Sequence, residues 1–320
     1  MSRILVTGAS GFIGRAVIAA LAKDGHALRA AGRRPPQLPF PPGVEAVQQP
    51  DFAHPFDWRP LLDGIDQVIH LAGIAHAGRD ITRELYDRVN RRATTHIATA
   101  AAQCGVQRFV FLSSIGAQSG PTADHALTER DPPRPTTAYG RSKLAAEEAV
   151  RTSGVAYTIL RPVLIYGPGV KGNFGLMFRA AASRLPLPVK HFSNRRSLLG
   201  IDNFISALRF VLASPATVNE TYVVSDPGVA LRLSDVIAVL RQARGRRSLV
   251  LPMPTGYFEI PLRLLRRTDL WDRVGGNLRV DAGKLAAAGW RPIHDTRAGL
   301  VAMVQAATPR KSGTASRSTR

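Results

Sequence analysis

Apolar positions follow two different periods along the first half of the chain. Short runs of β-branched and other apolar residues predict strands, whereas longer stretches with apolar residues at helical spacing predict helices. Their alternation predicts an α/β fold with a doubly wound parallel sheet covered on both faces. Residues 32–60 contain many prolines and are expected to be largely loop. The expected strands are Ile4–Thr7, His26–Ala31, Gln67–Leu71, Arg108–Leu112 and Tyr157–Leu160, and the expected helices are Phe12–Lys23, Ala93–Cys104, Thr137–Arg151 and Asp202–Leu212.

Three glycines stand between the first predicted strand and the first predicted helix. Gly8, Gly11 and Gly14 have the spacing G-x-x-G-x-x-G. The first glycine permits a tight turn, the second lets the backbone approach a pyrophosphate, and the third lets the helix pack on the strand. Because a strand precedes this turn and a helix follows it, the turn predicts a Rossmann-like dinucleotide-binding site.

The end of the second predicted strand indicates which dinucleotide is bound. NAD enzymes usually place a carboxylate there to accept hydrogen bonds from the ribose hydroxyls. This chain has Arg33 and Arg34 instead. Two guanidinium groups can hold a 2′-phosphate as bidentate donors. NADP is therefore the favoured cofactor and NAD the alternative. If both arginines instead point into solvent, they do not distinguish between the two dinucleotides.

A tyrosine and a lysine supply the candidate proton-transfer chemistry. Tyr139 and Lys143 are four residues apart on a predicted helix and so share one face. A neighbouring ammonium, together with the positive nicotinamide ring, favours the phenolate, which is expected to bring the phenol's pKa down towards the working range. Ser113 and Ser114 end the strand Arg108–Leu112, and a hydroxyl there can bond the reacting oxygen. We assign that role to Ser114 and ordinary turn chemistry to Ser113.

Composition narrows the remaining possibilities. The 320 residues carry a net charge of +20, and only six of the 43 basic residues are lysine. The arginines are spread along the chain without a basic stripe interleaved with aromatic residues, which argues against nucleic-acid binding. No apolar run reaches the length of a membrane span, and no metal site is expected. The single cysteine, Cys104, excludes an intrachain disulfide and is typical of a reducing cytoplasm.

After Tyr166 the regular alternation of predicted strands and helices ends, and Pro and Gly interrupt the segments that follow. We expect residues 1–165 to form the NAD(P)-binding domain, with 202–213 returning to it. Residues 166–307 are expected to form mainly a smaller substrate-binding annex over the carboxyl edge of the sheet. Residues 308–320 are rich in Ser, Thr, Gly and Arg and are expected to be a disordered basic tail.

Taken together, these motifs resemble the extended branch of the short-chain dehydrogenase/reductase superfamily, whose members act on nucleotide sugars. The likeness runs from Arg3 to about Ile293. It implies catalytic roles for Ser114, Tyr139 and Lys143. The phrases that carry it are Thr7–Gly14, His70–Gly73, Phe111–Ser114, Tyr139–Lys143, Leu160–Pro162 and Ile165–Gly169.

The resemblance also implies the residues around the cofactor and the substrate. Asp51 and Phe52 would flank the adenine, and Asn90 would lie near the active site. Asn173 and Arg196 would contact the nucleotide diphosphate, with help from Arg279. The full set implied around the cofactor is Gly8, Ser10, Gly11, Phe12, Ile13, Gly14, Arg33, Arg34, Asp51, Phe52, Leu71, Ala72, Gly73, Asn90, Tyr139, Lys143, Pro162 and Val163.

The resulting expectation is a cytoplasmic, NADP(H)-dependent enzyme acting at C4 of a UDP-sugar. Reduction of a 4-keto sugar for polysaccharide synthesis is favoured, with Tyr139 donating the proton. Dehydration is disfavoured because no carboxylate follows Ser114. The alternatives are a UDP-glucose or UDP-N-acetylglucosamine 4-epimerase, a reductase of apolar ketones, and a non-catalytic NADP-sensing binder. Relatives commonly dimerise through two helices, so Ala93–Cys104 and Thr137–Arg151 are the expected homodimer face.

Overall fold

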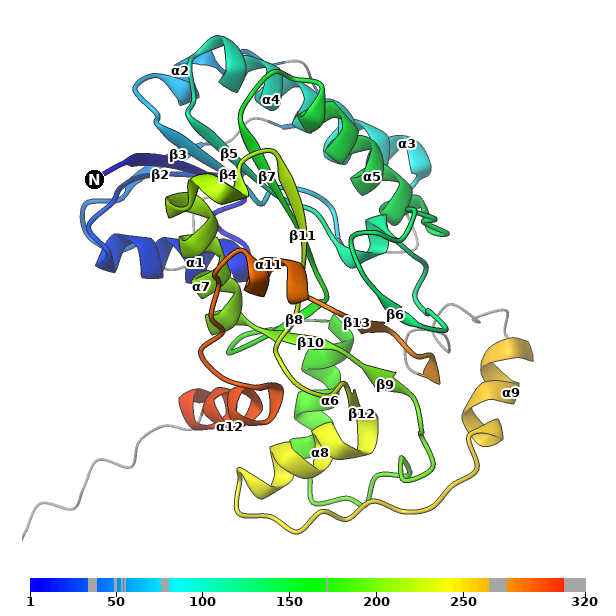
Figure 1. Cartoon of the computed structure of the whole chain (residues 1–320). Helices are drawn as coiled ribbons and strands as arrows, with labels where there is room; N and C mark the ends of the chain where they lie inside the picture. Colours follow the sequence, from blue (N-terminus) through cyan, green and yellow to red (C-terminus); the bar gives the residue numbers. More distant parts are fainter. Residues whose placement is uncertain are drawn as a thin grey trace, which may run out of the picture.

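A parallel sheet of seven strands forms the centre of the molecule (Figure 1). The computed structural model describes residues 1–33, 39–48, 51–52, 54, 56–75, 81–170, 172–264 and 275–307. The strand order is β11-β7-β5-β4-β1-β2-β3, and every neighbouring pair is parallel. This order reverses between β1 and β4, where open α/β sheets bind their ligands. The strands are β1 (Arg3–Thr7), β2 (Ala27–Gly32), β3 (Glu45–Gln48), β4 (Gln67–His70), β5 (Arg108–Leu112), β7 (Tyr157–Pro162) and β11 (Glu220–Val224).

Helices cover both faces of this sheet because side chains along each strand alternate between two apolar clusters. Ile4 and Val6 of β1 pack with α1 and α7, whereas Leu5 packs with α2, α4 and α5 on the other face. The predicted doubly wound, Rossmann-like fold is therefore confirmed. The helices are α1 (Phe12–Lys23), α2 (Arg59–Leu62), α3 (Arg83–Tyr86), α4 (Ala93–Gln103), α5 (Ala138–Arg151), α7 (Ile201–Ala213) and α11 (Gly283–Ala287), with short turns η1 (Asp87–Arg92), η2 (Ile115–Ala117) and η3 (Pro215–Thr217).

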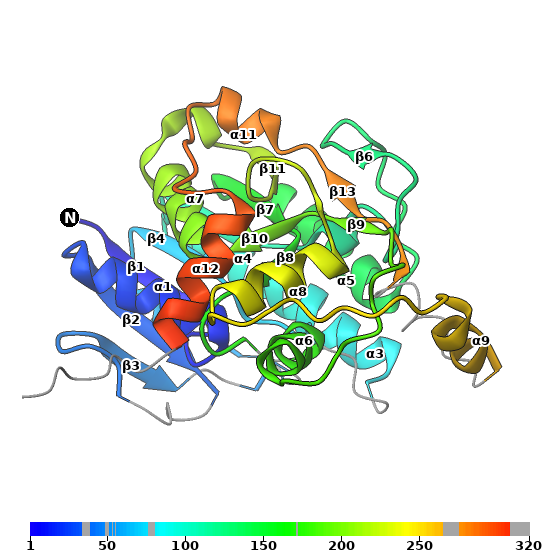
Figure 2. The same ribbon diagram turned by 90° about the horizontal axis from the view of Figure 1, so that it is seen from below.

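A smaller lobe lies beyond the carboxyl ends of the strands (Figures 1 and 2). Its own apolar cluster includes Phe174, Leu240 and Leu300, from α6, α8 and α12. Among the described residues, no helix has both the length and the apolar character needed to cross a membrane. The elements are α6 (Gly172–Ala182), α8 (Leu233–Gln242), α9 (Gly256–Leu264) and α12 (Thr296–Ala307), with strand pairs β8 (Leu164–Tyr166) and β10 (Leu198–Gly200), β9 (Arg195–Arg196) and β12 (Leu231–Arg232), and β6 (Ala126–Leu127) and β13 (Arg279–Val280).

One buried carboxylate joins the two parts of the molecule. Asp226 follows β11 and accepts hydrogen bonds from the Gly200 amide at 2.8 Å, Asn203 Nδ2 at 2.7 Å and the Tyr166 hydroxyl at 2.8 Å. These partners come from the end of β10, from α7 and from β8. Because a buried carboxylate is stable only when its oxygens are bonded, this network fixes how the smaller lobe sits on the sheet.

Two parts of the sheet differ from the sequence-based prediction. Residues 32–60 were expected to be largely loop, yet they include the edge strand β3 and the first residues of α2. Strand β3 is mostly exposed, so it lacks the alternation that marks a half-buried strand. The other sheet edge, β11, comes from the region assigned mainly to the annex and pairs with β7. The expected tail, 308–320, lies outside the described residues.

Candidate active site

The glycine turn is built as its spacing predicts. Gly8 has φ +68°, and a Cβ on it would lie 2.9 Å from the Ala72 amide nitrogen. A Cβ on Gly14 would lie 2.3 Å from the Gly8 carbonyl oxygen, closer than any real contact allows. The Gly11 amide closes the turn on the Gly8 carbonyl at 3.0 Å, and Gly11 is the N-cap of α1. The turn thus leads directly into the N-terminus of α1, where the helix dipole favours an anion.

An open cavity of about 190 Å³ lies against this turn. It brings together the carboxyl ends of β1, β2 and β4, as expected for a ligand at the switch point of the sheet. Phe12, Ile13 and Gly14 continue from the turn into α1 rather than lining the cavity, and Arg34 lies outside the described residues. The lining residues are Gly8, Ser10, Gly11, Arg33, Asp51, Phe52, Leu71, Ala72, Gly73, Ile74 and Val89, of which all but Ile74 and Val89 belong to the expected cofactor set.

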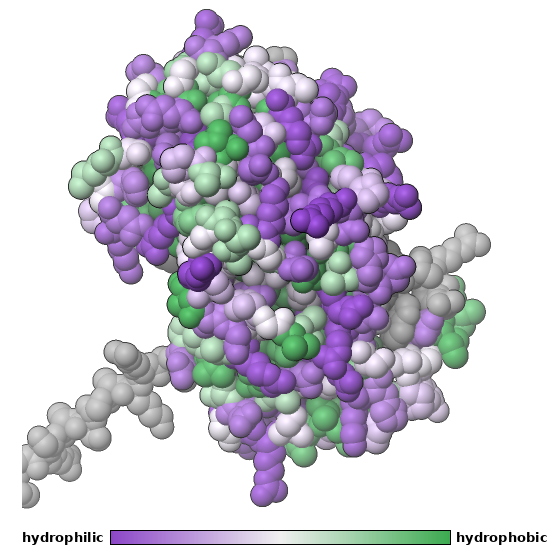
Figure 3. All heavy atoms as spheres, in the orientation of Figure 1, coloured by the Kyte–Doolittle hydropathy of each residue, from purple (hydrophilic) through white to green (hydrophobic). Residues whose placement is uncertain are grey.

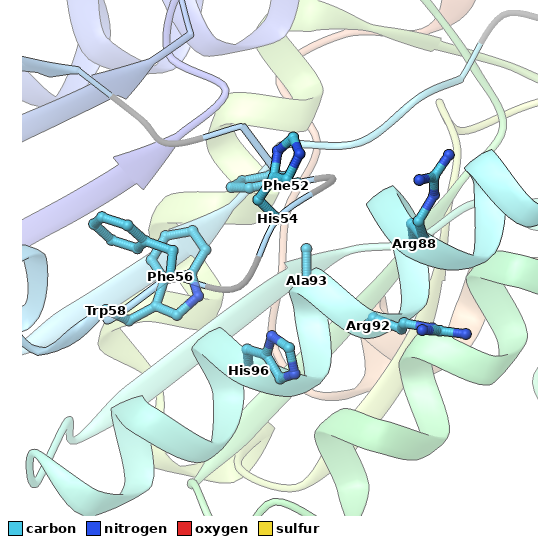
Figure 4. A pocket seen from close by; sticks show the side chains of 8 residues that line it. All are labelled: Phe52, His54, Phe56, Trp58, Arg88, Arg92, Ala93 and His96. Carbon is cyan, nitrogen blue, oxygen red and sulfur yellow. The ribbon is translucent and has the colours of Figure 1, made fainter.

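Phe52 also lines a second, smaller cavity of about 110 Å³ (Figure 4). Its ring lies 5.3 Å from the ring of Trp58, which in turn meets Phe56 edge-on at 5.6 Å. On the opposite wall, α4 and the turn before it contribute Arg92 and His96. The contact with Trp58 helps to hold the Phe52 ring in place where it lines both cavities.

Asn90 connects the segment after β4 with helix α5 through side-chain hydrogen bonds. Its Oδ1 accepts from the Ile74 amide at 2.8 Å, and its Nδ2 donates to the Ile74 carbonyl at 3.1 Å and to Ser142 Oγ at 3.0 Å. Asn90 lies in η1, a π-helical turn, a form that often occurs at functional sites. It thereby fixes the segment after β4 to helix α5, one residue before Lys143.

The three expected catalytic residues come together at the carboxyl end of β5. Ser114 follows β5 and caps η2, with its Oγ accepting from the Gly116 amide at 3.0 Å. Tyr139 and Lys143 lie on successive turns of α5, whose first turn packs on η2: a Cβ on Gly140 would lie 2.1 Å from the Gly116 carbonyl oxygen. That close approach is what brings the phenol beside Ser114.

Burial raises the pKa of the Tyr139 phenol, while a hydrogen bond with Ser114 acts in the opposite direction. In the protein alone, desolvation of the phenolate outweighs this hydrogen bond, so the pKa is raised rather than brought down towards the working range; the expected effect of the nicotinamide charge stays a prediction. The phenol of Tyr139 is held protonated at neutral pH and can act as a proton donor.

Burial also lowers the pKa of Lys143 to about 7, and the charge of Glu147 partly offsets this effect. Lys143 is 5% exposed, and its Nζ lies 4.3 Å from the centre of the Phe111 ring. A Cβ on Gly73 would lie 3.8 Å from the same Nζ, so the amine reaches the wall of the larger cavity. The amine thus titrates within the physiological range.

We expect Lys143→Met to stabilise the fold at neutral pH by about 2–4 kcal/mol, because it removes a buried amine whose charging is disfavoured. Between the unfolded pKa of 10.5 and the folded value near 7, only the unfolded state binds the proton. The gain should therefore be complete below about pH 7 and vanish as the pH rises through 10.5. Urea denaturation at pH 6.5 and pH 10.5 measures it, with the exposed Lys23→Met as control; an equal gain at both pH values would contradict this account.

A buried charged network supports helix α5, which carries Tyr139 and Lys143, and the sequence analysis did not assign it. The Glu147 carboxylate is fully buried and accepts from Arg161 Nε at 2.9 Å, Arg161 Nη2 at 2.6 Å and Ser113 Oγ at 2.5 Å. Arg161 Nη1 donates to Gln118 Oε1 at 2.8 Å. A charged residue inside the buried strand β7 needs a buried partner, and this is the signal that could have revealed the network.

The candidate substrate residues lie in the smaller lobe or at its edge. Arg196 donates to the carbonyls of Gly276 at 2.9 Å and Pro121 at 3.1 Å. Arg279 Nη2 donates to the Asp124 carbonyl at 3.3 Å, while its buried Nε has no partner among the described residues. Both arginines thus border the loop that follows Ser114. Asn173 lies in α6, and its side chain is outside the described residues.

Two further expected cofactor residues, Pro162 and Val163, lie where β7 ends. Pro162 closes the strand, and the Val163 amide donates to the Val224 carbonyl at 3.1 Å. Val163 is buried in the core cluster shared with α1 and α7. Both residues thus lie at the carboxyl end of the sheet, where open α/β sheets bind their ligands.

The fold and this site define an enzyme of the extended short-chain dehydrogenase/reductase type. Residues 4–225 match the NAD dependent epimerase/dehydratase family, and the chain belongs to that family.

The chain is 30% identical over 318 residues to a UDP-glucose 4-epimerase of Vibrio cholerae, covering 95% of this chain and 94% of the relative. It is 26% identical to the N-acetyl-α-D-glucosaminyl-diphospho-ditrans,octacis-undecaprenol 4-epimerase of Escherichia coli O157:H7, over 79% of this chain and 76% of the relative. The solved UDP-N-acetylglucosamine 4-epimerase of Bacillus cereus superposes with a TM-score of 0.77 at 21% identity, over 96% of this chain and 99% of that one.

Proposed function

We propose that this protein interconverts the C4 epimers of a nucleotide-linked hexose. The observation that supports the proposal is that Tyr139 lies beside Ser114, while Lys143, one turn further along α5, reaches Gly73 in the wall of the cavity that the glycine turn lines. The similarity to a UDP-glucose 4-epimerase extends over nearly both whole chains, which favours epimerisation over the net reduction expected from the sequence.

The residues around the larger cavity fit a nicotinamide dinucleotide. The turn leaves no space for a Cβ on Gly8 or Gly14, which suits close approach of a pyrophosphate to the backbone. When bound, such a cofactor supplies a reversible acceptor for a hydrogen with its electron pair. Lys143 would bond its ribose, and the Phe52 ring would lie against its adenine.

The protein's own part in the reaction is proton transfer and alignment. Tyr139 would exchange a proton with the oxygen on C4, and Ser114 would bond the same oxygen and fix its direction. The Lys143 ammonium, when protonated, would favour the phenolate formed at Tyr139. Arg279, whose Nε has no partner in the described part of the chain, would contact the diphosphate of the substrate.

Incubation with UDP-glucose, UDP-galactose and their N-acetylamino counterparts, followed by proton NMR, tests this proposal. We expect one pair to interconvert towards the same equilibrium from either side without net change in the cofactor. A matched incubation with the undecaprenyl-diphosphate-linked hexosamine tests the carrier named for the E. coli relative. Failure to interconvert any of these sugars would contradict epimerisation.

A second candidate is an NADPH-dependent reductase of a 4-keto nucleotide sugar. Arg33 favours it, because this side chain follows β2 and lines the larger cavity where NAD enzymes usually have a carboxylate. Loss of reduced-nicotinamide absorbance only when a 4-keto sugar is added would support net reduction over epimerisation.

Arg33→Glu should reverse the preference between the two cofactors. We expect the affinity for NADP to fall about 10- to 100-fold, because a charge-assisted contact with the 2′-phosphate is replaced by repulsion. NAD affinity should stay the same or rise. Titration calorimetry with both dinucleotides measures the effect, and Lys23→Glu applies the same charge change at the exposed end of α1. Unchanged NADP affinity would remove Arg33 from this role.

A further inference from the structure

The smaller lobe carries an exposed apolar face that the catalytic site does not use. Twelve large hydrophobic residues are exposed in the described part of the chain, and six of them are Leu185 and five residues within 249–264. We call these six residues the apolar tip: Leu185, Leu249, Leu251, Tyr257, Ile260 and Leu264.

Half of the apolar tip forms a stripe along α9. Tyr257, Ile260 and Leu264 follow spacings of three and four residues and so share one face of this helix. Their side chains are 71%, 60% and 79% exposed. Glu259 is two residues from Tyr257 and therefore lies on a different side of the helix. A face this apolar would be buried against the core if α9 packed on the body of the protein.

Helix α9 instead stands away from the rest of the lobe in both ribbon views (Figures 1 and 2). Figure 3 shows hydrophobic atoms at the same edge of the molecule. The other half of the tip is held in place by backbone hydrogen bonds. The Leu187 amide donates to the Leu249 carbonyl at 3.0 Å, and the Leu251 amide donates to the Leu187 carbonyl at 2.9 Å. The chain then runs from Leu251 directly into α9.

Exposed basic side chains accompany the half of the apolar tip formed by Leu185, Leu249 and Leu251. Arg184 and Lys190 flank Leu185, and Arg246 and Arg247 precede Leu249; all four are exposed. The sequence has no acidic residue in 184–191 or in 243–258. Apolar residues edged by exposed cations are the combination that binds anionic membrane surfaces, where the side chains enter the headgroup layer and the cations meet lipid phosphates.

We propose that the apolar tip docks this enzyme on an anionic phospholipid bilayer. A second copy of the chain fits less well, because like charges around two facing tips would repel. A nucleic acid would satisfy the cations but leave the apolar stripe in water. An anionic bilayer can bind the basic side chains through its lipid phosphates and bury the apolar stripe. This docking does not depend on the proposed catalytic function.

Vesicle flotation with the full chain tests this proposal without cofactor or substrate. We expect binding to vesicles of phosphatidylcholine and phosphatidylglycerol in a 7:3 ratio, weaker binding to pure phosphatidylcholine, and loss of binding with added salt. The double variant Ile260→Ser/Leu264→Ser should bind at least about tenfold less, since two apolar side chains no longer enter the bilayer. Equal melting curves establish that this variant is folded.

The matched control is Val229→Ser/Ile293→Ser, which changes two residues that are 74% and 61% exposed outside the tip. It should float like the unmodified protein. Both variants keep the basic segment 308–320, so a difference between them reports on α9 alone. The proposal is overturned if the unmodified protein does not float with the anionic vesicles, or if the α9 variant floats equally well. It is also overturned if light scattering shows that the α9 variant only converts a dimer to a monomer.

Discussion

Tyr139→Phe is expected to reduce the turnover number by about 10²- to 10⁴-fold while leaving dinucleotide affinity within about twofold. The hydroxyl is the proposed proton carrier at C4, and a positioned acid–base group contributes a factor of this size. The phenyl ring keeps its packing between Tyr86, 6.1 Å away, and Gly116, so cofactor binding should survive. Steady-state kinetics and fluorescence titration separate the two effects.

Tyr157→Phe is the matched control for this variant. Tyr157 begins β7 and therefore lies at the sheet edge opposite to the catalytic residues. Its loss of a hydroxyl should leave turnover unchanged. If Tyr139→Phe kept more than a tenth of the unmodified rate, the proton would have to come from another group.

Glu147→Gln is expected to lower the free energy of unfolding by about 3–5 kcal/mol. The substitution leaves the guanidinium of Arg161, 4% exposed, buried without its countercharge. Burial alone would raise the pKa of Glu147, but the hydrogen bonds and charge of Arg161 outweigh burial, so the pKa is lowered. The carboxylate therefore stabilises the fold above its unfolded pKa, and the difference between the two proteins should shrink as the pH falls below 4.5.

Glu148→Gln is the control on the same helix. The Glu148 side chain is 68% exposed and pairs only loosely with Arg151, at 3.5 Å, so its loss should cost less than about 1 kcal/mol. Urea denaturation at pH 7.5 and pH 4 compares the three proteins. A Glu147→Gln protein within 1 kcal/mol of the unmodified one at pH 7.5 would show that Arg161 does not need this partner.

Elements with a strong local period were predictable from the sequence. Phe12–Lys23 and Arg108–Leu112 have the predicted bounds, because each combines a clear apolar pattern with nearby turn residues. The glycine turn likewise predicted the place of the cavity, and the Tyr139–Lys143 spacing predicted that these two side chains lie one turn apart on a helix. Local chemistry was sufficient for these features.

Features that depend on distant partners were not predicted. Strand β11 joins the sheet only after the chain has passed through α6 and α7, so its own sequence does not say which sheet it completes. Glu147 is one helical turn beyond Lys143, yet its role depends on Arg161 from β7. The pKa of Tyr139 is raised because the phenol is buried, and the spacing of Tyr139 and Lys143 in the sequence does not indicate how deeply either side chain is buried.

The central claim is that Tyr139 works at C4 of a hexose whose C4 hydrogen leaves and returns within one active site. The most direct test is conversion of UDP-hexose that carries deuterium at C4, with the product analysed by NMR and mass spectrometry. We predict that the C4 epimer forms with the deuterium still on C4. A product that has exchanged this deuterium for solvent hydrogen would contradict the account.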